Sequence, residues 1–406
     1  MKVINKGVCA PLGFKANGIH AGIRKNKSKI DLALIYSECV ASAAAVYTTN
    51  LVKGAPIYVT QANLNNGYAQ AMICNSGNAN TCNADGVEIA TQTCEILAKS
   101  LNIKAEDVIV ASTGVIGLPL SIKPFEDNMD IVVAGLGDTD VHADKAYQGI
   151  MTTDTVKKEV AVEFELGGKK CHIGAITKGS GMIHPQMATM LCFITTDVAI
   201  TPKMLDKALK STVDDTFNMV SVDGDTSTND MVSIMANGMA GNTLIDSENN
   251  DYNEFVKALY YVNTELAKQM AKDGEGATKL LICEVKNAKT KADAKLVAKS
   301  VICSSLLKSA MFGSDANWGR VLCAIGYSKA NVDVLKVDVA FTSKKGTIPV
   351  CKNGSGIPFS EEIAKEILLE DEITINIDLN DGDALAYAYG CDLTYDYVKI
   401  NGDYRS

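Results

Sequence analysis

Histidine is scarce in this sequence, with four in 406 residues, and none stands in a motif that would activate a neighbouring serine or cysteine. The phosphate loop G-x-x-x-x-G-K-[ST], the nucleophile elbow G-x-S-x-G and the zinc motif H-E-x-x-H are also absent. These absences remove support for nucleotide hydrolysis, for α/β-hydrolase chemistry and for zinc-protease chemistry. A nucleophile in this chain would need another way to be activated.

Long apolar runs, paired cysteines and excess positive charge are missing as well. The twelve cysteines are dispersed without a C-x-x-C pair, which predicts free, mostly buried thiols rather than a zinc site or a disulfide framework. No run approaches the roughly 18 apolar residues of a membrane span, and no apolar signal segment follows the first lysines. A net charge of −9 argues against a nucleic-acid partner. We expect a cytoplasmic protein with no metal and no membrane contact.

Alternating helical and strand-like patterns predict a layered α/β protein. Helical spacing over 86–101 precedes the strand VIVAS and the glycine-rich turn STGVIG, and a hairpin with Gly167-Gly168 at its turn is expected over 160–176. A short β-type run is expected at 57–60. The Asn- and Gly-rich segment 71–85 is expected to be a shaped loop.

Two further patterns receive a structural interpretation. Ser305 to Lys308 has the S-x-x-K spacing of serine acylases, but no S-D-N or K-T-G element accompanies it. We expect a helix there, with Ile302, Leu306 and Ala310 on one side. A cluster of four lysines is expected to form one solvated helix face. It consists of Lys289, Lys291, Lys295 and Lys299.

Thr189 stands between a Gly/Pro-containing linker, KGSGMIHPQMAT, and a strand-like run at 191–200. A lone threonine in this place could be an inert strand-starting residue. If the peptide bond before Thr189 breaks, however, its hydroxyl gains a base in its own freed α-amine, whose reference pKa of about 7.7 to 8.0 leaves it substantially neutral near physiological pH. Nucleophile and base would then belong to one residue.

Several long motifs stand in order along the chain. They are NSGNAN (75–80), STGVIG (112–117), MTTDT (151–155), KGSGMIHPQMATML, VDGDTSTND (222–230), DGEGATK (273–279), NWGR (317–320) and GCDLTYDYVKINGDYRS. Through them the sequence resembles the glutamate N-acetyltransferase family of arginine biosynthesis, also called ornithine acetyltransferase, over essentially its whole length. It departs from that pattern at Gln186, Tyr389 and Ser406, where Asn, Trp and Thr are usual.

The resemblance implies a layered α/β sandwich like that of self-processing N-terminal-nucleophile enzymes, with a smaller C-terminal α/β domain. It implies cleavage between Ala188 and Thr189 into an α chain, 1–188, and a β chain, 189–406. Residues 189–283 would complete the catalytic core, and residues 284–406 would form the C-terminal domain. Two copies of each chain are expected to associate in a heterotetramer.

The resemblance also implies the site. Thr189 would be the nucleophile, and Thr113 and Gly114 would form the oxyanion hole. Lys178 could pair a substrate carboxylate, and Glu275 the side-chain ammonium of ornithine. The implied substrate contacts are Thr152 (with Thr153 as an open alternative), Lys178, Thr189, Glu275, Asn401 and Ser406.

The implied reaction moves the acetyl group of N2-acetyl-L-ornithine to L-glutamate through acetyl-Thr189. It gives L-ornithine and N-acetyl-L-glutamate and requires no cofactor. Whether acetyl-CoA also serves as donor stays open, because both forms of the family share these motifs. Two alternatives also stay open: an N-terminal-nucleophile amidohydrolase or aminopeptidase with water as acceptor, and a non-catalytic amino-acid-binding protein that remains uncut.

Overall fold

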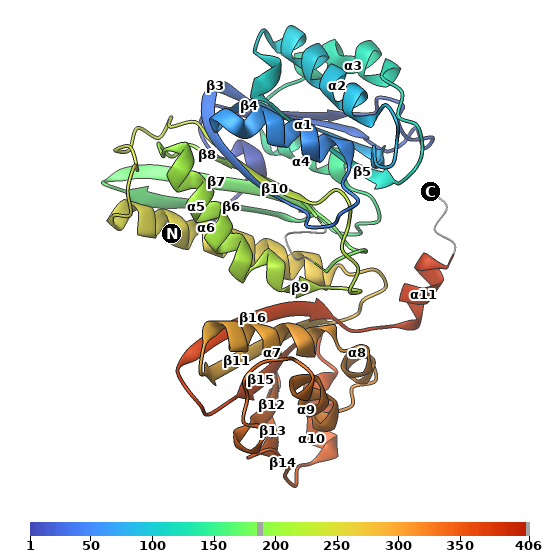
Figure 1. Cartoon of the computed structure of the whole chain (residues 1–406), viewed down its shortest axis with the longest axis vertical. Coiled ribbons are helices and arrows are strands. Elements are labelled where there is room, and N and C mark those ends of the chain that lie inside the picture. Colours follow the sequence, from blue (N-terminus) through green and yellow to red (C-terminus); the bar gives the residue numbers. More distant parts are fainter. Residues whose placement is uncertain (185–189, 403–406) are drawn as a thin grey trace.

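The computed structural model of the chain describes residues 1–184 and 190–402, and two β-sheets form its framework (Figure 1). In the first sheet the order of the strands is β1 (Lys2–Ile4), β6 (Glu159–Leu166), β7 (Lys169–Lys178), β8 (Leu191–Thr196), β10 (Met231–Ala236), β3 (Leu32–Tyr47), β4 (Tyr68–Asn78) and β5 (Val108–Val115), with β2 (Phe14–Ile19) beside β3. Strands β8 and β10 are parallel, as are β4 and β5, and the other pairs are antiparallel.

Helices cover both faces of the first sheet because its strands bury side chains in both directions. In β8, Leu191 and Phe193 join the core that contains residues of α4. The alternate residues Cys192 and Ile194 join the core formed with α5 and α6. The helices of this part are α1 (Ala55–Asn63), α2 (Gly86–Leu101), α3 (Lys123–Ala134), α4 (Asp140–Ile150), α5 (Pro202–Asp215) and α6 (Asn250–Lys272).

The second sheet lies on the other side of α6. Its order is β14 (Ser355–Gly356), β13 (Gly346–Lys352), β12 (Asp338–Ser343), β15 (Glu372–Asp378), β11 (Leu280–Ala288), β16 (Ala384–Cys391) and β9 (Val220–Ser221). In β11, Leu280 and Ile282 join the core around α6, whereas Leu281 and Cys283 join a core shared with α7 (Lys291–Cys303). Helix α6 is therefore packed between the two sheets.

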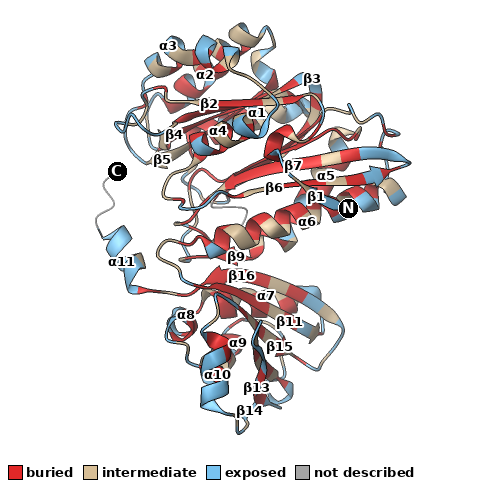
Figure 2. Cartoon of the chain, turned by 180° about the vertical axis from the view of Figure 1, so that it is seen from behind, coloured by how far each residue is buried: buried red, intermediate tan, exposed pale blue. Residues whose placement is uncertain are grey.

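The core that β11 shares with α7 also contains residues of α8 (Ser305–Phe312), α9 (Trp318–Gly326) and α10 (Glu361–Leu368). Buried residues fill both sheets and the helix faces that lie on them, while α11 (Tyr395–Asn401) is largely exposed (Figure 2). The layered α/β class and the smaller C-terminal α/β part that the sequence predicts are thereby confirmed.

Two of the expected local structures are wrong. Residues 57–60 lie in α1, because Pro56 occupies its first turn and Ile57 and Thr60 are buried against neighbouring elements. Packing thus overrides the β-type composition of this run. Residues 71–78 belong to β4 rather than to a loop, and their polar side chains are buried in hydrogen bonds. Among them, Asn75 accepts from Ser112 Oγ at 2.6 Å.

Strand ends also differ from the expectation. Strand β5 continues to Val115, so most of STGVIG lies in a strand instead of a turn. Strand β8 ends at Thr196. The helix expected to contain Ile302, Leu306 and Ala310 is divided into two helices at Ser304, which caps α8 by accepting from Leu307 N. Ile302 therefore lies in α7, and Leu306, in α8, is exposed.

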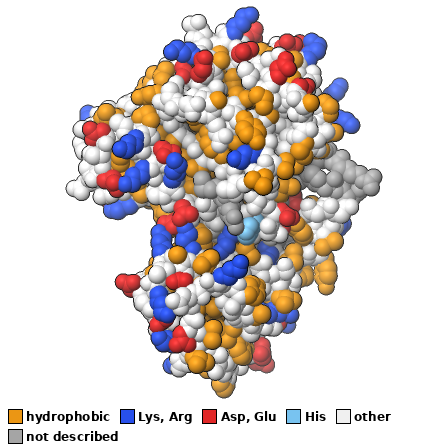
Figure 3. Space-filling model, in the orientation of Figure 1, with side chains coloured by type: hydrophobic (Ala, Val, Ile, Leu, Met, Phe, Trp, Pro, Cys, Tyr) orange, Lys and Arg blue, Asp and Glu red, His pale blue; other side chains and the backbone are white. Residues whose placement is uncertain are grey.

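The lysine face of α7 is solvated only in part. Lys291 is exposed and Lys295 is partly buried, and both pair with Asp215 at the end of α5. Lys299 donates to Asn218 O at 2.8 Å and to Val220 O, and burial lowers the pKa of Lys299 to about 8. Cationic side chains gather at the narrow region between the part built on the first sheet and the part built on the second sheet (Figure 3), where α7 meets the end of α5.

The twelve cysteines are free, and eight of them are buried, as the sequence predicts. No helix among the described residues has the length and apolar character needed to cross a membrane. Within the same residues, no group of three or more His, Cys, Asp and Glu side chains is arranged to hold a metal ion.

Candidate active site

A cavity of about 330 Å³ lies where the ends of β5 and β7 meet the segment after α6 and the end of α11. Six of the residues predicted for the site line it together, although they come from distant parts of the sequence. The complete lining is Thr113, Gly114, Val115, Ile116, Thr152, Thr153, Lys178, Gly181, Met182, Met190, Leu191, Ser227, Asn229, Asp230, Glu275 and Asn401.

The predicted nucleophile Thr189 lies outside the described residues, as do Ala188, Gln186 and Ser406. Residues on both sides of the segment 185–189 nevertheless line the cavity. Gly181 and Met182 line it before that segment, and Met190 lines it after. The cavity therefore adjoins the two points between which the predicted cleavage site is placed.

Thr113 and Gly114 stand at the end of β5, where its parallel register with β4 becomes irregular. Gly114 has φ +133°, a conformation that side chains rarely adopt, and a Cβ there would lie 2.4 Å from the carbonyl carbon of Gly77. Gly114 also lines the cavity. The backbone at Gly114 can therefore approach a ligand closely.

Lys178, the last residue of β7, donates from Nζ to Thr113 Oγ1 at 3.5 Å. An ammonium group only donates hydrogen bonds, so the Thr113 oxygen accepts and its own proton is free to point elsewhere. The Thr113 hydroxyl and the N–H at Gly114 are thus suited to stabilise one developing negative charge.

Asn229 holds this corner in place, although sequence reasoning assigned it no role. Its Nδ2 donates to Ser112 O at 3.0 Å and to Ala79 O at 2.6 Å, and its Oδ1 accepts from Thr81 Oγ1 at 2.6 Å. The side chain is buried and ties the NSGNAN and STGVIG motifs to VDGDTSTND. The run of polar residues in the last motif was the available signal, but its burial is visible only in the structure.

Thr152 and Thr153 both line the cavity, and their contacts separate them. Thr153 Oγ1 is 2.6 Å from Ser180 Oγ, so its hydroxyl is already engaged. The backbone N of Thr152 donates to Asp154 Oδ2 at 3.0 Å. The hydroxyl of Thr152 has no hydrogen-bond partner among the described residues. This geometry favours Thr152 as the residue that offers a hydroxyl to a ligand.

The cavity carries charges of both signs. Burial lowers the pKa of Lys178, while the carboxylates of Asp154 and Asp230 raise it. Burial would raise the pKa of Asp154, but Lys178, Lys158 and its hydrogen bonds bring it down to about 2. Asp154 is therefore an anion throughout the physiological range and supports the cationic form of Lys178.

Glu275 lies in the segment that joins α6 to β11. Its backbone N donates to Ser180 O at 2.8 Å, and its Oε2 accepts from Asn401 Nδ2 at 2.8 Å. A Cβ on Gly181 would lie 2.2 Å from Glu275 Oε2, so glycine permits this close approach. The linker, the segment after α6 and the end of α11 thus meet at Glu275.

An ammonium and a carboxylate in one small cavity, beside an oxyanion-stabilising corner, suit the binding and acyl chemistry of an amino acid. Of the lining residues, Thr113, Gly114, Thr152 (with Thr153 as its alternative), Lys178, Glu275 and Asn401 were predicted, and the sequence assigned no role to the others, which include Asn229, Asp230 and Ser227. The roles of the predicted residues in the chemistry stay predictions.

Comparisons with known proteins agree with this picture. The family model described as the ArgJ family matches residues 15–406. The arginine biosynthesis bifunctional protein ArgJ 1 of Clostridium acetobutylicum is 53% identical over 408 residues, which cover 100% of this chain and 99% of that protein. The arginine biosynthesis bifunctional protein ArgJ of Bacillus subtilis is 47% identical over 404 residues, covering 98% of this chain and 96% of that protein.

A solved structure is similar as well. The crystal structure of the arginine biosynthesis bifunctional protein argJ from Bacillus halodurans is 47% identical with a TM-score of 0.51, and the match covers 53% of this chain and 100% of that one. The family resemblance predicted from the motifs is confirmed by these matches over nearly the whole length. The chain belongs to the ArgJ family.

Proposed function

We propose that this protein is an acyltransferase of arginine biosynthesis that carries the acetyl group of N2-acetyl-L-ornithine to L-glutamate. The observation that carries the proposal is the grouping of Thr113, Gly114, Lys178 and Glu275 around one cavity, which Met190, the residue directly after Thr189, also lines. Membership of the ArgJ family, whose relatives are named as arginine biosynthesis bifunctional proteins, supports the same pathway.

Processing comes first in this mechanism. The Thr189 hydroxyl attacks the carbonyl carbon of Ala188, the peptide C–N bond breaks, and an ester forms. Water then hydrolyses the ester, which leaves a carboxylate on Ala188 and a free amine and hydroxyl on Thr189. The new amine can take the hydroxyl proton near neutral pH.

Transfer follows in two steps. The Thr189 hydroxyl attacks the acetyl carbonyl of N-acetylornithine, and the oxyanion is stabilised by Thr113 Oγ1–H and the N–H of Gly114. The amide C–N bond breaks, ornithine leaves with a proton on its amine, and an acetyl ester remains. The amine of glutamate then attacks this ester and releases the Thr189 hydroxyl. One amide replaces another, so the balance of the reaction requires no nucleotide.

The two products of processing remain together in this proposal. Strand β8 follows Thr189 and pairs with β7, which precedes it, so one sheet contains both chains. In addition, β8 and β10 of the later chain lie between β7 and β3 of the earlier one. Cleavage therefore leaves the hydrogen-bond ladder intact. Association of two such pairs into a heterotetramer is part of the same proposal.

The decisive experiment supplies N-acetylornithine, acetyl-CoA or neither to the processed protein together with glutamate. N-acetylglutamate from N-acetylornithine would support the proposed transfer, and N-acetylglutamate from acetyl-CoA would add the second donor. Release of acetate without N-acetylglutamate would point instead to an amidohydrolase with water as acceptor. A single uncut band on a denaturing gel, with no turnover, would contradict the enzyme proposal.

A further inference from the structure

A buried cluster of three charged residues adjoins the cavity. Lys158 Nζ donates to Asp154 Oδ1 at 2.7 Å and to Asp273 Oδ2 at 2.5 Å. The side chains of Lys158 and Asp154 are fully buried, and that of Asp273 is 4% exposed. Removing three ions from water is costly, and hydrophobic residues of similar volume often stabilise a fold at least as well. Stability alone is therefore a poor explanation of the cluster.

The two carboxylates of the cluster also hold backbone segments near residues that line the cavity. Asp154 accepts from Thr152 N at 3.0 Å and from Gly179 N at 2.7 Å, and Gly179 directly follows Lys178. One carboxylate thus fixes two of the segments that line the cavity.

Asp273 does the same on the opposite side. It accepts from Thr155 N at 3.0 Å and from Thr155 Oγ1, and Glu275 is two residues further along the chain. Lys158 joins the two carboxylates, so the cluster links the segments that carry Thr152 and Lys178 to the one that carries Glu275.

The cluster also spans the predicted cleavage site in the sequence. Asp154 and Lys158 precede Ala188, whereas Asp273 follows Thr189. After processing, the Lys158–Asp273 contact would therefore connect the two chains. The same contact would fix the distance between the cationic and the anionic ends of the cavity, which would lie on different chains.

Electrostatics add a second effect on Lys178. Burial, together with Lys158, holds the pKa of Lys178 below its ordinary value, while the carboxylates of Asp154 and Asp230 oppose that shift. Asp154 stands first among the groups that favour the cation. If Asp154 lost its charge, Lys158 and Lys178 would have one carboxylate fewer to balance their positive charges.

We propose that Asp154, Lys158 and Asp273 form a positioning unit, which sets the two charged ends of an amino-acid pocket across the predicted cleavage site. This inference rests on the proposed function, because Lys178 and Glu275 are its predicted substrate contacts. The three residues act through Thr152, Lys178 and Glu275.

The test is Asp154→Asn in the full-length chain. The amide keeps the shape of the side chain and one acceptor oxygen but removes the negative charge. Ornithine binding, measured by calorimetry between pH 6 and 10, should weaken roughly tenfold near neutral pH, and its alkaline limb should move down by about one pH unit, since Lys178 would lose its proton more readily. In acetyl transfer, the KM for N-acetylornithine should rise more than kcat falls.

A matched control is Asp144→Asn on α4. Asp144 makes an exposed ion pair with Lys157 at 3.3 Å, and its side chain is 41% exposed. The same change of acid to amide should leave ornithine affinity and its pH profile unaltered there. If Asp154→Asn lowers the thermal midpoint but matches the wild type in affinity and pH profile, the cluster is merely structural and the inference is overturned.

A second variant covers the case in which Asp154→Asn does not fold. Asp273→Asn keeps Asp154 with Lys158 and should let the two processed chains separate at a lower urea concentration, with weaker ornithine binding. Unchanged separation and affinity would refute the positioning unit. Failure of the proposed function looks different: the wild-type protein itself would bind no ornithine and transfer no acetyl group, while chain separation would still report on the cluster.

Discussion

Gly114 shows how one residue can set the chemistry of the site. Its φ is +133°, and an added Cβ would stand 2.4 Å from Gly77 C and 2.6 Å from Asn78 N, which are backbone atoms. We expect Gly114→Ala to displace the N–H that this position offers to an oxyanion. The single-turnover rate with N-acetylornithine should fall by about 10²-fold or more, the usual scale for losing one such donor.

The control for Gly114→Ala is Gly326→Ala at the end of α9, where a Cβ would meet nothing within 4 Å. This variant should transfer acetyl at the wild-type rate, because alanine favours a helix and nothing needs to move. A Gly114→Ala protein with normal single-turnover kinetics would remove the β5 corner from the mechanism.

Thr189 is the residue on which processing depends in the proposal. Thr189→Ala should leave a full-length chain on a denaturing gel, because a methyl group replaces the only oxygen able to perform the acyl shift. Thr189→Ser keeps the hydroxyl and should still be cut, more slowly. Two fragments from the alanine variant would show that another group breaks the bond.

At the scale of single residues, the sequence indicates charged and hydroxyl-bearing site residues that stand in motifs. It does not indicate the buried side chains that position the backbone around the site. Lys178 and Glu275 could be predicted because they stand in motifs of the family that the sequence resembles, and their charges suit an amino acid. Asn229 acts by hydrogen bonds to peptide groups more than 100 residues away, and Asp154 by bonds to one peptide group nearby and one 25 residues away. Nothing in a single sequence reveals which peptide group a buried polar side chain will meet.

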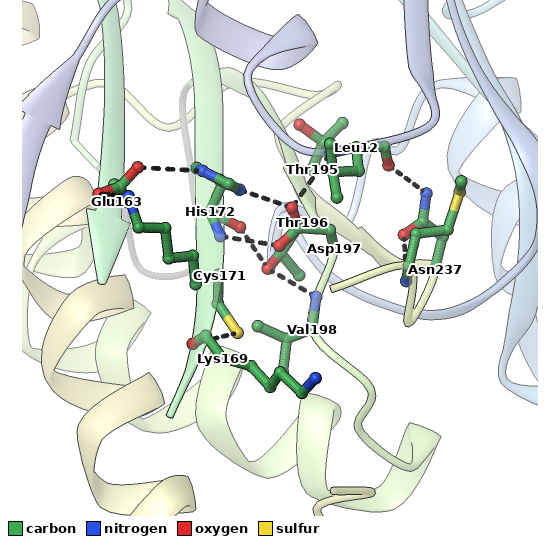
Figure 4. A network of polar contacts seen from close by, with 12 residues as sticks. Leu12, Glu163, Lys169, Cys171, His172, Thr195, Thr196, Asp197, Val198 and Asn237 are labelled. Carbon is green, nitrogen blue, oxygen red and sulfur yellow. Dashed lines mark hydrogen bonds and ion pairs between the residues drawn. The ribbon is translucent and has the colours of Figure 1, made fainter. Parts of the chain in front are cut away.

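Among the elements, β7 carries polar contacts at both of its ends. Lys178 ends the strand at the cavity, and His172 lies near its start. There His172 Nδ1 and Asp197 Oδ2 are 2.7 Å apart, and Asp197 also accepts from the backbone N of His172 and of Leu12 (Figure 4). The Asp197 side chain is fully buried, so its charge depends on these donors.

This pair predicts a pH dependence of stability. The hydrogen bond with Asp197 raises the pKa of His172 despite burial, with further help from Glu163. A raised pKa means that protonated His172 stabilises the fold fully below its unfolded-state pKa and that this contribution is lost as the pH rises through the folded value. As the pH rises above about 6.5, the thermal midpoint should thus fall more steeply in the wild type than in His172→Asn. Parallel curves for the two proteins would contradict this assignment.

Helices and strands are predictable here to the extent that local pattern and packing agree. Helix α2 occupies 86–101 as its spacing predicts, and Gly167 and Gly168 join β6 and β7 with φ values of +53° and +78°. The prediction was wrong for α1, because its β-branched residues pack on other elements. It was also wrong for β4, because buried hydrogen bonds satisfy a composition typical of loops.

The cavity is a property of the whole molecule. Thr113 and Lys178 come from the first sheet, Glu275 from the segment between α6 and β11, and Asn401 from α11 beyond the second sheet. Figure 1 and Figure 2 show α11 on the same side of the molecule as β5. The family motifs imply that these residues share a site, but composition and spacing do not indicate how they meet, because that depends on α6 packing between two sheets.

A single nucleophile in a single cavity also fixes the order of events. Thr189 must carry the acetyl group before glutamate can react, so ornithine leaves first. Double-reciprocal plots of rate against N-acetylornithine at several glutamate concentrations should therefore be parallel. Intersecting lines would indicate direct transfer within a ternary complex, and Thr189 would then act in self-cleavage alone.

The acetylated intermediate gives the same prediction a chemical readout. Protein mixed with N-acetylornithine and quenched in acid before glutamate is added should carry one acetyl group on the fragment that begins at Thr189. An acetyl group on the α-amine would be a stable amide and a dead end, whereas one on the hydroxyl would be a reactive ester. Glutamate added before the quench should discharge the ester and yield an equal amount of N-acetylglutamate. An acetyl group that glutamate does not remove would identify the amide and exclude it as the intermediate.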